Sequence, residues 1–317
     1  METTSNATAS STSLRKHIEE SAIRQFNATT YFYKAAEGGG ERRSLNRGDH
    51  SFQFNVMNSS NATTDDIVLA EGVTPEGRGI TFSPVIPTIS QYGDFAEISD
   101  LAARDNPFPL IEESAYELGR KFGLLVDAIV QTQLILGTQA IIRTAADATT
   151  VRASLVAADV FKAKRLAEAR AKLSTNFVPE IGQGYVAFIH PNVIFDLHTE
   201  SGTGTFVDVN KYARPEEILK GEIGKLYGVR VVEAKNITVL TGAGAGGINV
   251  YPSYIVGRWA YGVVVSQDME TFYKDFGSGG TNDPLNQRAT VGMKARFGAT
   301  ILKDQSIVRV ESSSSIG

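Results

Sequence analysis

The stretch from Ala289 to Ile301 alternates between apolar and polar or small side chains, a period of two that is typical of a half-buried β-strand. The apolar positions are Val291, Met293, Ala295, Phe297, Ala299 and Ile301. The polar segment 303–306 then predicts a turn into a second apolar segment, "IVRVE". We therefore expect a pair of antiparallel strands at this end of the chain.

Residues 111–141 carry apolar side chains at helical spacing instead. These are Ile111, Ala115, Leu118, Phe122, Val126, Ile129 and Leu136. An unbroken helix of this length would span about 45 Å, and Glu112 and Glu113 suit its first turn because the helix dipole favours anions there. Gly119, Gly123 and Gly137 weaken the helix and predict a kink. A second helix is expected over 155–172, with Ser154 as its N-cap.

Residues 65–98 predict a hairpin, with two β-rich segments on either side of a turn at Pro75-Glu76-Gly77. Pro84 and Pro87 cannot donate the backbone hydrogen bond that an interior strand needs, so this is an edge ribbon or a free arm. An isolated two-stranded hairpin is marginal in water. The ribbon therefore needs a surface to lie on, and that surface can belong to another subunit.

The remaining chain predicts short alternating elements. Strands are expected over 184–190, 228–234, 236–240, 248–257 and 258–266, and helices over 191–199 and from Pro215 to about 221. Pro191 suits the first helical position because its missing N–H has no partner there anyway. Residues 1–13 are low in complexity, and we expect them to be mobile. Residues 14–61 show little periodicity and are interpreted as an arm rather than a domain. The pattern as a whole is α+β, with segregated elements.

Composition narrows the function. The 317 residues are 42% hydrophobic and 21% charged, which is ordinary for a soluble protein. A net charge of −4 argues against a DNA-coating surface, because phosphate binding needs clustered Lys and Arg. No cysteine is present, so disulfides and thiolate chemistry are excluded. We see neither a signal peptide nor a membrane-spanning stretch, and expect a soluble protein that is intracellular at synthesis.

One glycine pattern raises the question of a cofactor. Gly242, Gly244 and Gly247 follow the spacing G-x-G-x-x-G after the predicted strand 236–240. A dinucleotide fingerprint needs a helix next, because the helix N-terminus binds the pyrophosphate. Residues 248–252 are β-like and end in Pro252, so the loop is interpreted as a flexible connection between antiparallel strands. A nucleotide-binding oxidoreductase remains the alternative from another class of function.

Other candidate chemistry is weak. The four histidines, His17, His50, His190 and His198, match no metal-binding spacing, and His190 and His198 are interpreted as structural or capping residues. Glu112-Glu113 and Glu216-Glu217 suit helix starts, since adjacent carboxylates point apart. Trp259 and Tyr261 are interpreted as core packing rather than an aromatic cage. We predict no catalytic residue, cofactor or metal, and hence no enzyme.

Four segments, in this order and spacing, resemble the major capsid proteins of tailed bacteriophages. They are "LAEGVTPEGRGITFSPVIPTISQYGDFAEISD", "GYVAFIHPNVIFDL", "EEILKGEIGKLYGVRVVEA" and "DPLNQRATVGMKARFGATIL". The resemblance covers about residues 66–302 and is greatest for the podophage group typified by the coat protein of coliphage N-four. None of the four segments is a catalytic motif.

The resemblance implies an α+β, HK-ninety-seven-type capsid fold. Its expected parts are an N-terminal arm (1–64), an extended-loop hairpin (65–100), a peripheral domain with a long spine helix (101–184), an axial domain (185–280), and return strands with a C-terminal tail (281–317). The glycine loop then belongs to the axial domain.

The implied function is a major capsid protein that self-assembles as hexamers and pentamers into an icosahedral virion shell around double-stranded DNA, held by weak non-specific contacts. The implied partners are a separate scaffolding protein and a portal, and assembly is expected in the cytoplasm of a bacterial host, with no membrane. Another phage or encapsulin-like shell component is a further alternative. The residues expected to make inter-subunit contacts are Glu71, Pro75, Glu76 and Arg78.

Overall fold

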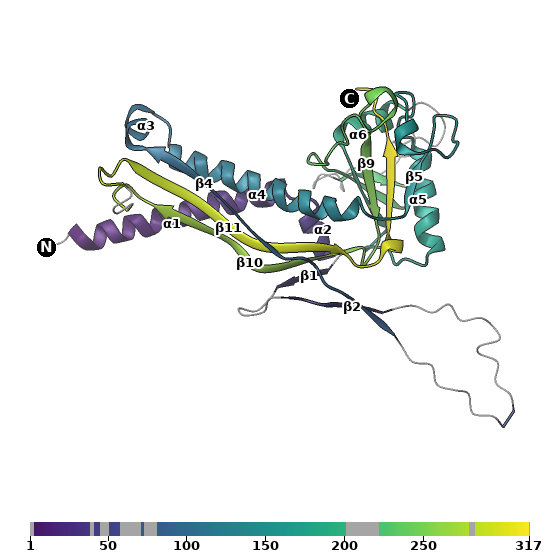
Figure 1. Ribbon diagram of the computed structural model, residues 1–317, viewed down its shortest axis with the longest axis horizontal. Helices are drawn as coiled ribbons and strands as arrows, with labels where there is room; N and C mark the ends of the chain where they lie inside the picture. The colour runs from purple at the N-terminus through teal and green to yellow at the C-terminus, as the bar shows by residue number, and fades with distance from the viewer. Residues whose placement is uncertain are drawn as a thin grey trace.

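The computed structural model describes residues 3–38, 41–44, 51–57, 71–72, 81–200, 222–278 and 283–316. The described chain forms an elongated layer of helices and strands joined at one end to a compact body, with a narrow ribbon projecting from their junction (Figure 1). Its helices are α1 (Thr3–Thr29), α2 (Phe32–Gly38), α3 (Asp100–Asp105), α4 (Leu110–Leu134), α5 (Ala163–Thr175) and α6 (Pro191–Thr199).

The strands form two main sheets and the ribbon. The elongated part holds a four-stranded sheet in the order β1 (Glu41–Ser44), β10 (Tyr261–Lys274), β11 (Arg288–Ile301), β4 (Ser90–Ser99). The compact body holds a six-stranded sheet in the order β5 (Ala140–Ile142), β12 (Ile307–Ser312), β9 (Tyr251–Val256), β6 (Tyr185–Ile189), β8 (Val229–Glu233), β7 (Glu222–Leu226). The ribbon pairs β2 (Phe54–Met57) with β3 (Phe82–Val85).

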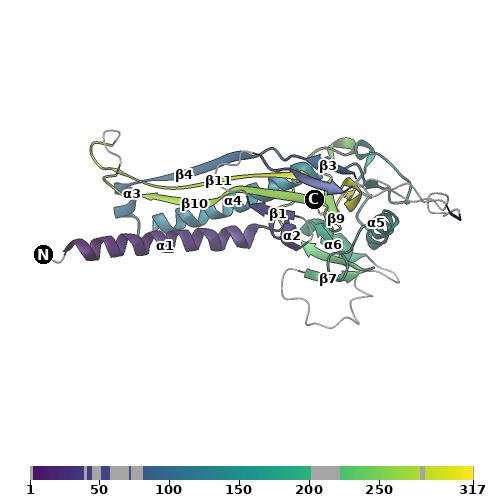
Figure 2. The same cartoon turned by 90° about the horizontal axis from the view of Figure 1, so that it is seen from below.

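The four-stranded sheet confirms the alternation of β11. Val291, Met293, Ala295 and Phe297 are buried, whereas Lys294 and Arg296 are only partly covered. The buried side chains pack against α4, and α1 lies alongside α4 over the same face of the sheet (Figure 2). Helices thus cover one face of the sheet; on the other face, Val264 packs with Phe54 of β2, and Phe95 and Phe272 are exposed.

The six-stranded sheet is covered on both faces. All five residues of β6 are buried, as its continuous apolar run predicts. Leu166 of α5 and Leu197 of α6 belong to the core on one side of this sheet. On the other side, Phe188 packs with Phe32 and Leu134, which joins the compact body to the helices of the elongated part.

Helix α6 begins as the sequence predicts. Pro191 occupies its first turn, and the Nδ1 of His190 accepts a hydrogen bond from the backbone N–H of Asn192, at 3.2 Å. The capping interpretation of His190 is therefore confirmed. Helix α4 begins at Leu110, close to the expected start, but ends at Leu134 rather than near residue 141. The chain turns there because Asp304 accepts the backbone N–H of Thr138, at 2.8 Å.

Three expectations about local structure were wrong. Residues 3–29, where no helix was expected, form the long helix α1, and Ile18 and Ala22 of this helix are buried against α4. Residues 155–162 are not helical, and α5 begins only at Ala163. Residues 236–240 form a single bridge, between Leu240 and Val250, rather than a strand.

The final strand differs most from its expected place. "IVRVE" does not pair with β11; β12 runs antiparallel to β9 and parallel to β5, inside the six-stranded sheet. Every residue of β12 is buried, which suits an interior strand and not the exposed edge of a hairpin. The expected helix from Pro215 lies outside the described residues. Across the described ranges, no helix combines the length and apolar character needed to cross a membrane.

Candidate assembly surfaces

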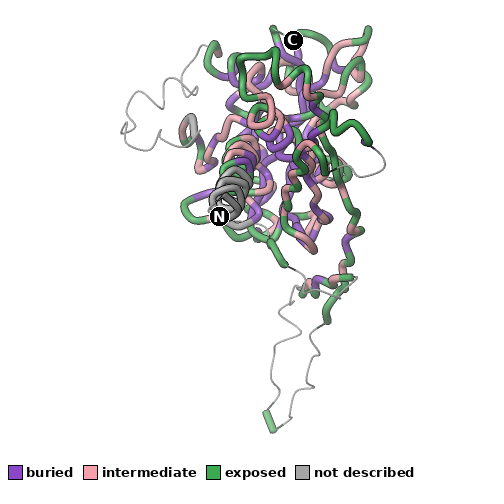
Figure 3. The backbone as a smooth tube through the Cα atoms, turned by 90° about the vertical axis from the view of Figure 1, so that its left-hand side faces the viewer, coloured by how far each residue is buried: buried purple, intermediate pink, exposed green. Residues whose placement is uncertain are grey.

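The β2–β3 ribbon presents apolar side chains to solvent. Its base is anchored, because Phe54 is buried with Val264 and Leu302. At the other end of the pairing, Met57 and Phe82 are exposed, as is Ile86 directly after β3, and the ribbon leaves the body of the molecule (Figures 1 and 3). Exposed apolar patches of this kind mark interaction sites in soluble proteins. The ribbon is thus a candidate assembly surface.

The ribbon differs from the predicted hairpin in its strands. Residues 82–85 pair with 54–57, and residues 90–99 pair instead with β11 in the four-stranded sheet. Of the residues expected to make inter-subunit contacts, Glu71 is exposed. Pro75, Glu76 and Arg78 lie outside the described residues. Glu71 is thus the one member of the set that lies in the described part of the chain, and the inter-subunit role of all four residues stays a prediction.

A second apolar feature lies on the open face of the four-stranded sheet. Phe95 of β4 and Phe272 of β10 are both in register with Gly292 of β11, so the two rings flank a position without a side chain. Phe95 is 65% exposed and Phe272 is 47% exposed. Lys294 lies over the Phe272 ring, with its Nζ 5.4 Å from the centroid. The alternation of β11 predicts that Gly292 lies on the outward face, but the alignment of the Phe95 and Phe272 rings beside it follows from the pairing of the three strands.

A buried carboxylate connects the two parts of the molecule. Asp127 of α4 accepts hydrogen bonds from the backbone N–H groups of Tyr31 (2.6 Å), Phe32 (3.3 Å) and Tyr33 (3.0 Å), at the start of α2. It accepts a fourth from the side-chain amide of Asn236 (2.7 Å). One turn later, Gln131 accepts from the backbone N–H of Thr238, at 2.7 Å. Burial raises the pKa of Asp127 above its ordinary value.

Sequence reasoning did not single out this junction. Asp127 and Gln131 lie on the inner face of α4, beside Val130 and Leu134, where periodicity predicts apolar residues. A charged residue in a predicted core stripe is itself a signal, because a buried charge needs hydrogen-bond partners. The partners could not be identified from sequence, since Tyr31 and Asn236 are distant in the chain.

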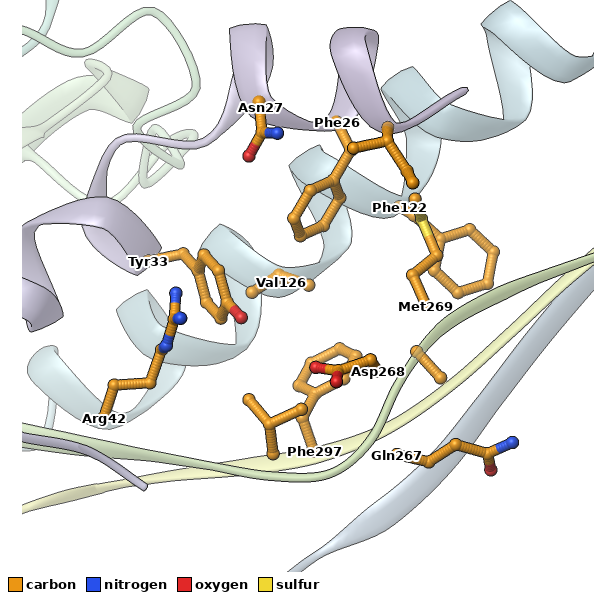
Figure 4. Close-up of a pocket in the computed structure, with 13 residues that line it drawn as sticks. Phe26, Asn27, Tyr33, Arg42, Phe122, Val126, Gln267, Asp268, Met269 and Phe297 are labelled. Atoms are coloured by element: carbon orange, nitrogen blue, oxygen red, sulfur yellow. The ribbon is translucent and has the colours of Figure 1, made fainter. Parts of the chain in front are cut away.

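A cavity of about 220 Å³ lies between α1, α4 and the sheet, surrounded by Phe26, Tyr33, Phe122 and Phe297 (Figure 4). Arg42 stacks over the Tyr33 ring at one side of it, 5.2 Å from the centroid. The cavity lies where β10 shifts its register against β11, between Val265 and Glu270. It is lined mainly by core side chains, and this favours a packing defect over a catalytic cleft.

The glycine loop does not have the geometry of a dinucleotide site. A short 3-10 turn, Ala245–Gly247, is followed by the strand β9 and not by an α-helix. Gly242 has a φ of +68°, and its surroundings are open, so it provides a left-handed turn. Gly244 has a negative φ, and a Cβ there would lie 2.9 Å from the carbonyl of Leu155. The interpretation as a connection before an antiparallel strand is the one that fits.

No group of three or more His, Asp or Glu residues in the described ranges could hold a metal ion. Tyr261, which the sequence interpretation placed in the core, is fully buried and donates its hydroxyl to the carbonyl of Phe32, at 2.7 Å. Trp259, by contrast, is 37% exposed. The assignment of Trp259 to the core was therefore wrong.

Comparison with known proteins identifies the fold. The capsid of cyanophage P-SCSP1u is 17% identical, with a TM-score of 0.66, and the match covers 90% of this chain and 89% of that one. The capsid of Ralstonia phage GP4 is 16% identical, with a TM-score of 0.65, and the match covers 87% of this chain and 86% of that one. A virus-like particle from Pyrococcus furiosus is 12% identical, with a TM-score of 0.55, and the match covers 93% of this chain and 98% of that one. Likeness at these identities shows a shared HK-ninety-seven-type fold.

Sequence comparison adds the family. No curated protein shows significant sequence similarity to the chain. A sequence model of the family described as phage capsid protein matches residues 83–310, which is more than half of the chain and extends from the ribbon to β12. The match includes α4, most of both sheets (β1 lies outside it) and the open sheet face with Phe95 and Phe272. The chain belongs to this family of phage capsid proteins, and its role is to form the capsid shell.

Proposed function

We propose that the chain is the principal subunit of an icosahedral shell around double-stranded DNA, arranged in hexamers and pentamers. The observation that carries the proposal is the family match over 83–310, together with an elongated body that leaves apolar surface exposed on the ribbon and the sheet. A monomer with such surface needs neighbours to cover it. The proposal includes membership of the N-four-like group, a non-enzymatic role, and assembly in the cytoplasm of a bacterial host.

The role proposed for each part of the chain follows the family resemblance. In the proposal, residues 1–64 act as the N-terminal arm, 65–100 as the extended loop, 101–184 with 281–317 as the peripheral domain, and 185–280 as the axial domain. A separate scaffolding protein and a portal are proposed as partners. Genome contact is proposed to be non-specific, since the net charge of −4 opposes a dedicated DNA surface.

Electron microscopy of the purified full-length protein, with size-exclusion chromatography, tests this function. We expect closed, uniform shells or capsomers that convert to shells as concentration rises. The alternative of an oxidoreductase predicts a small soluble oligomer that binds NAD saturably, which calorimetry would detect. A stable small oligomer that binds NAD would overturn the proposal.

A further alternative is another shell component, as the likeness to the virus-like particle from Pyrococcus furiosus illustrates. The identity of 12% concerns fold alone, whereas the family match favours a phage capsid. Shells recovered from infected cells separate the two, because a capsid protein is expected to enclose the phage genome. Particles that hold only protein cargo would contradict the capsid proposal.

A further inference from the structure

Two exposed aromatic side chains line one cavity at the junction of the two sheets. Phe177 and Trp259 border a cavity of about 350 Å³. Both have left-handed backbone conformations, with φ of +53° and +58°. Such conformations are rare for bulky residues, and they gather at sites where function outweighs local stability.

Phe177 occupies a position that suits glycine. It follows α5, where its N–H bonds to the carbonyl of Ser174 (3.0 Å) and the N–H of Val178 bonds to that of Leu173 (3.1 Å). Helices that end this way usually place glycine at the left-handed position. Phe177 is also 88% exposed, so its ring gains little from burial within the subunit. Glycine would adopt the left-handed conformation with less strain and would expose no apolar ring to solvent. Local structure therefore gives no reason for phenylalanine here.

Trp259 is held in place by the backbone around it. It lies in the connection from β9 to β10, where the N–H of Arg258 bonds to the carbonyl of Pro179 (3.0 Å) and the N–H of Gly257 to that of Ser306 (2.9 Å). These bonds fix the turn and present the indole at the surface. The subunit's own backbone contacts thus hold this turn without a partner, and a preformed site loses less entropy on binding.

Two cations lie over the indole. The guanidinium carbon of Arg258 is 4.9 Å from the ring centroid of Trp259, and the Nζ of Lys303 is 5.5 Å from it. Neither side chain forms a salt bridge with an acid in the described part of the chain. The pair provides positive charge next to an exposed aromatic ring, a combination suited to a negatively charged partner.

A second cavity of about 290 Å³ is also bordered by Trp259 and Lys303. Its other lining side chains are mainly apolar and come from β2 and from the residue directly after β11, among them Val56, Met57 and Leu302. The first cavity, in contrast, includes Asn176 and other polar residues. The two cavities thus offer an apolar compartment and a polar one on either side of a cationic centre.

We propose that these two cavities bind an extended acidic segment of a partner protein. Its carboxylates pair with Arg258 and Lys303, an apolar side chain enters the compartment beside β2, and a second packs on Phe177. Aromatic and arginine side chains in a preformed pocket are typical anchors of protein interfaces. A nucleic acid fits less well, because it has no apolar side chain for the compartment beside β2 and the subunit's net charge is −4.

The position of the site gives the contact a structural consequence. The chain crosses between the two sheets at 257–260 and again at 302–306, and both connections border the cavities. β2 adds the base of the ribbon. A bound segment would therefore contact the compact body, the elongated sheet and the ribbon at once (Figure 1). Its binding would favour one relative arrangement of these three parts over others.

Fluorescence anisotropy on the full-length subunit tests the proposal with a labelled acidic peptide, acetyl-DEFDELDE. We expect saturable binding that weakens as salt increases. The variant Arg258→Ala/Lys303→Ala should bind about tenfold more weakly, which corresponds to about 1.4 kcal/mol. The matched control is Lys294→Ala, which removes a similar cation from the Phe272 ring outside the site. It should bind as the wild type does.

Phe177→Gly provides a signature that a merely structural role would not give. It should raise the thermal midpoint, because glycine relieves the left-handed strain, while weakening peptide binding about threefold or more. A control peptide with serine in place of phenylalanine and leucine should bind more weakly than the parent peptide.

The proposal is overturned if no peptide binds, if the double variant binds as well as the wild type, or if the serine peptide matches the parent. Tighter binding of a short thymidine oligonucleotide would also overturn it, in favour of a nucleic acid. Because binding is measured on the subunit, the result is independent of whether shells form.

Discussion

At the scale of the residue, Asp127 shows how one buried polar group can hold separate segments together. Its carboxylate accepts the backbone N–H groups of Tyr31, Phe32 and Tyr33 and the amide of Asn236. The donors come from the start of α2 and from the connection between β8 and β9. Apolar packing is non-directional, so these bonds fix the geometry of the junction more sharply than the surrounding core does.

Asp127→Asn should lower the free energy of unfolding by about 1–3 kcal/mol at neutral pH, because one amide N–H₂ would face a backbone donor. Urea unfolding followed by circular dichroism measures this. The exposed Asp94→Asn is the control and should change stability little.

The same comparison has an expected pH dependence. Burial raises the folded-state pKa of Asp127 above its unfolded value, so protonation favours the folded state. The stability this adds is fully present below the unfolded pKa, about 3.9 for Asp, and is lost as pH rises through the folded pKa. The advantage of wild type over Asp127→Asn should therefore widen on acidification toward pH 4. If the difference in free energy of unfolding between wild type and Asp127→Asn stays constant or decreases toward pH 4, the raised pKa of Asp127 is contradicted.

At the scale of the element, α1 depends on α4 for its place. Gly119 and Gly123, which the sequence predicts as weak points of α4, are instead where α1 makes close contact. A Cβ at Gly119 would lie 2.4 Å from the carbonyl oxygen of Ala22. The two glycines therefore permit a close helix–helix approach that any side chain would prevent.

Gly119→Ala should displace α1, since a backbone carbonyl cannot move aside as a side-chain end can. We expect a net loss of about 1–2 kcal/mol, since overpacking costs about 1–3 kcal/mol and alanine's higher helix propensity returns up to about 1 kcal/mol. Hydrogen exchange along α1 should increase. Thr132→Ala, an exposed change in the same helix, is the matched control and should leave α1 protected. Unchanged exchange in Gly119→Ala would show that α1 does not rely on this contact.

At the scale of the whole molecule, the β2–β3 ribbon makes few stabilising contacts with the rest of its own subunit. β2 and β3 have four residues each, and apart from the buried Phe54 the ribbon adds little to the core. Its exposed apolar residues gain burial only from another surface. The ribbon and its tip are accordingly where assembly and subunit folding can be separated experimentally.

Replacing residues 72–79 with a short Gly-Ser link should leave the subunit's thermal unfolding nearly unchanged and abolish or misdirect shell formation. The change removes Pro75, Glu76 and Arg78. Exposed ion pairs made by Glu76 and Arg78 with a neighbouring subunit would contribute only about 0–1 kcal/mol each but would repeat in every subunit. Calorimetry and electron microscopy of one preparation give both readouts. Normal shells from the variant, or a subunit that no longer folds, would each contradict the predicted role.

The sequence alone determined the elements with strong periodicity. The alternation of β11, the apolar run of β6, the start of α4 and the proline at the start of α6 each follow from local patterns that pair one face with the core. The order of segments was enough to identify the family. It also predicted that a strand and not a helix follows the glycines at 242–247, because the segment 248–252 is β-like and contains Pro252.

Only the tertiary structure decided which elements meet. α1 is too polar to be predicted by periodicity and is helical because α4 covers its few apolar residues, and β12 joins the six-stranded sheet because both of its faces must be buried. The junction at Asp127 and the cationic aromatic site at Trp259 each combine residues that are far apart in the chain. Local pattern reports which face of an element is buried; the partner that buries it is set by long-range packing, which no single segment of sequence contains.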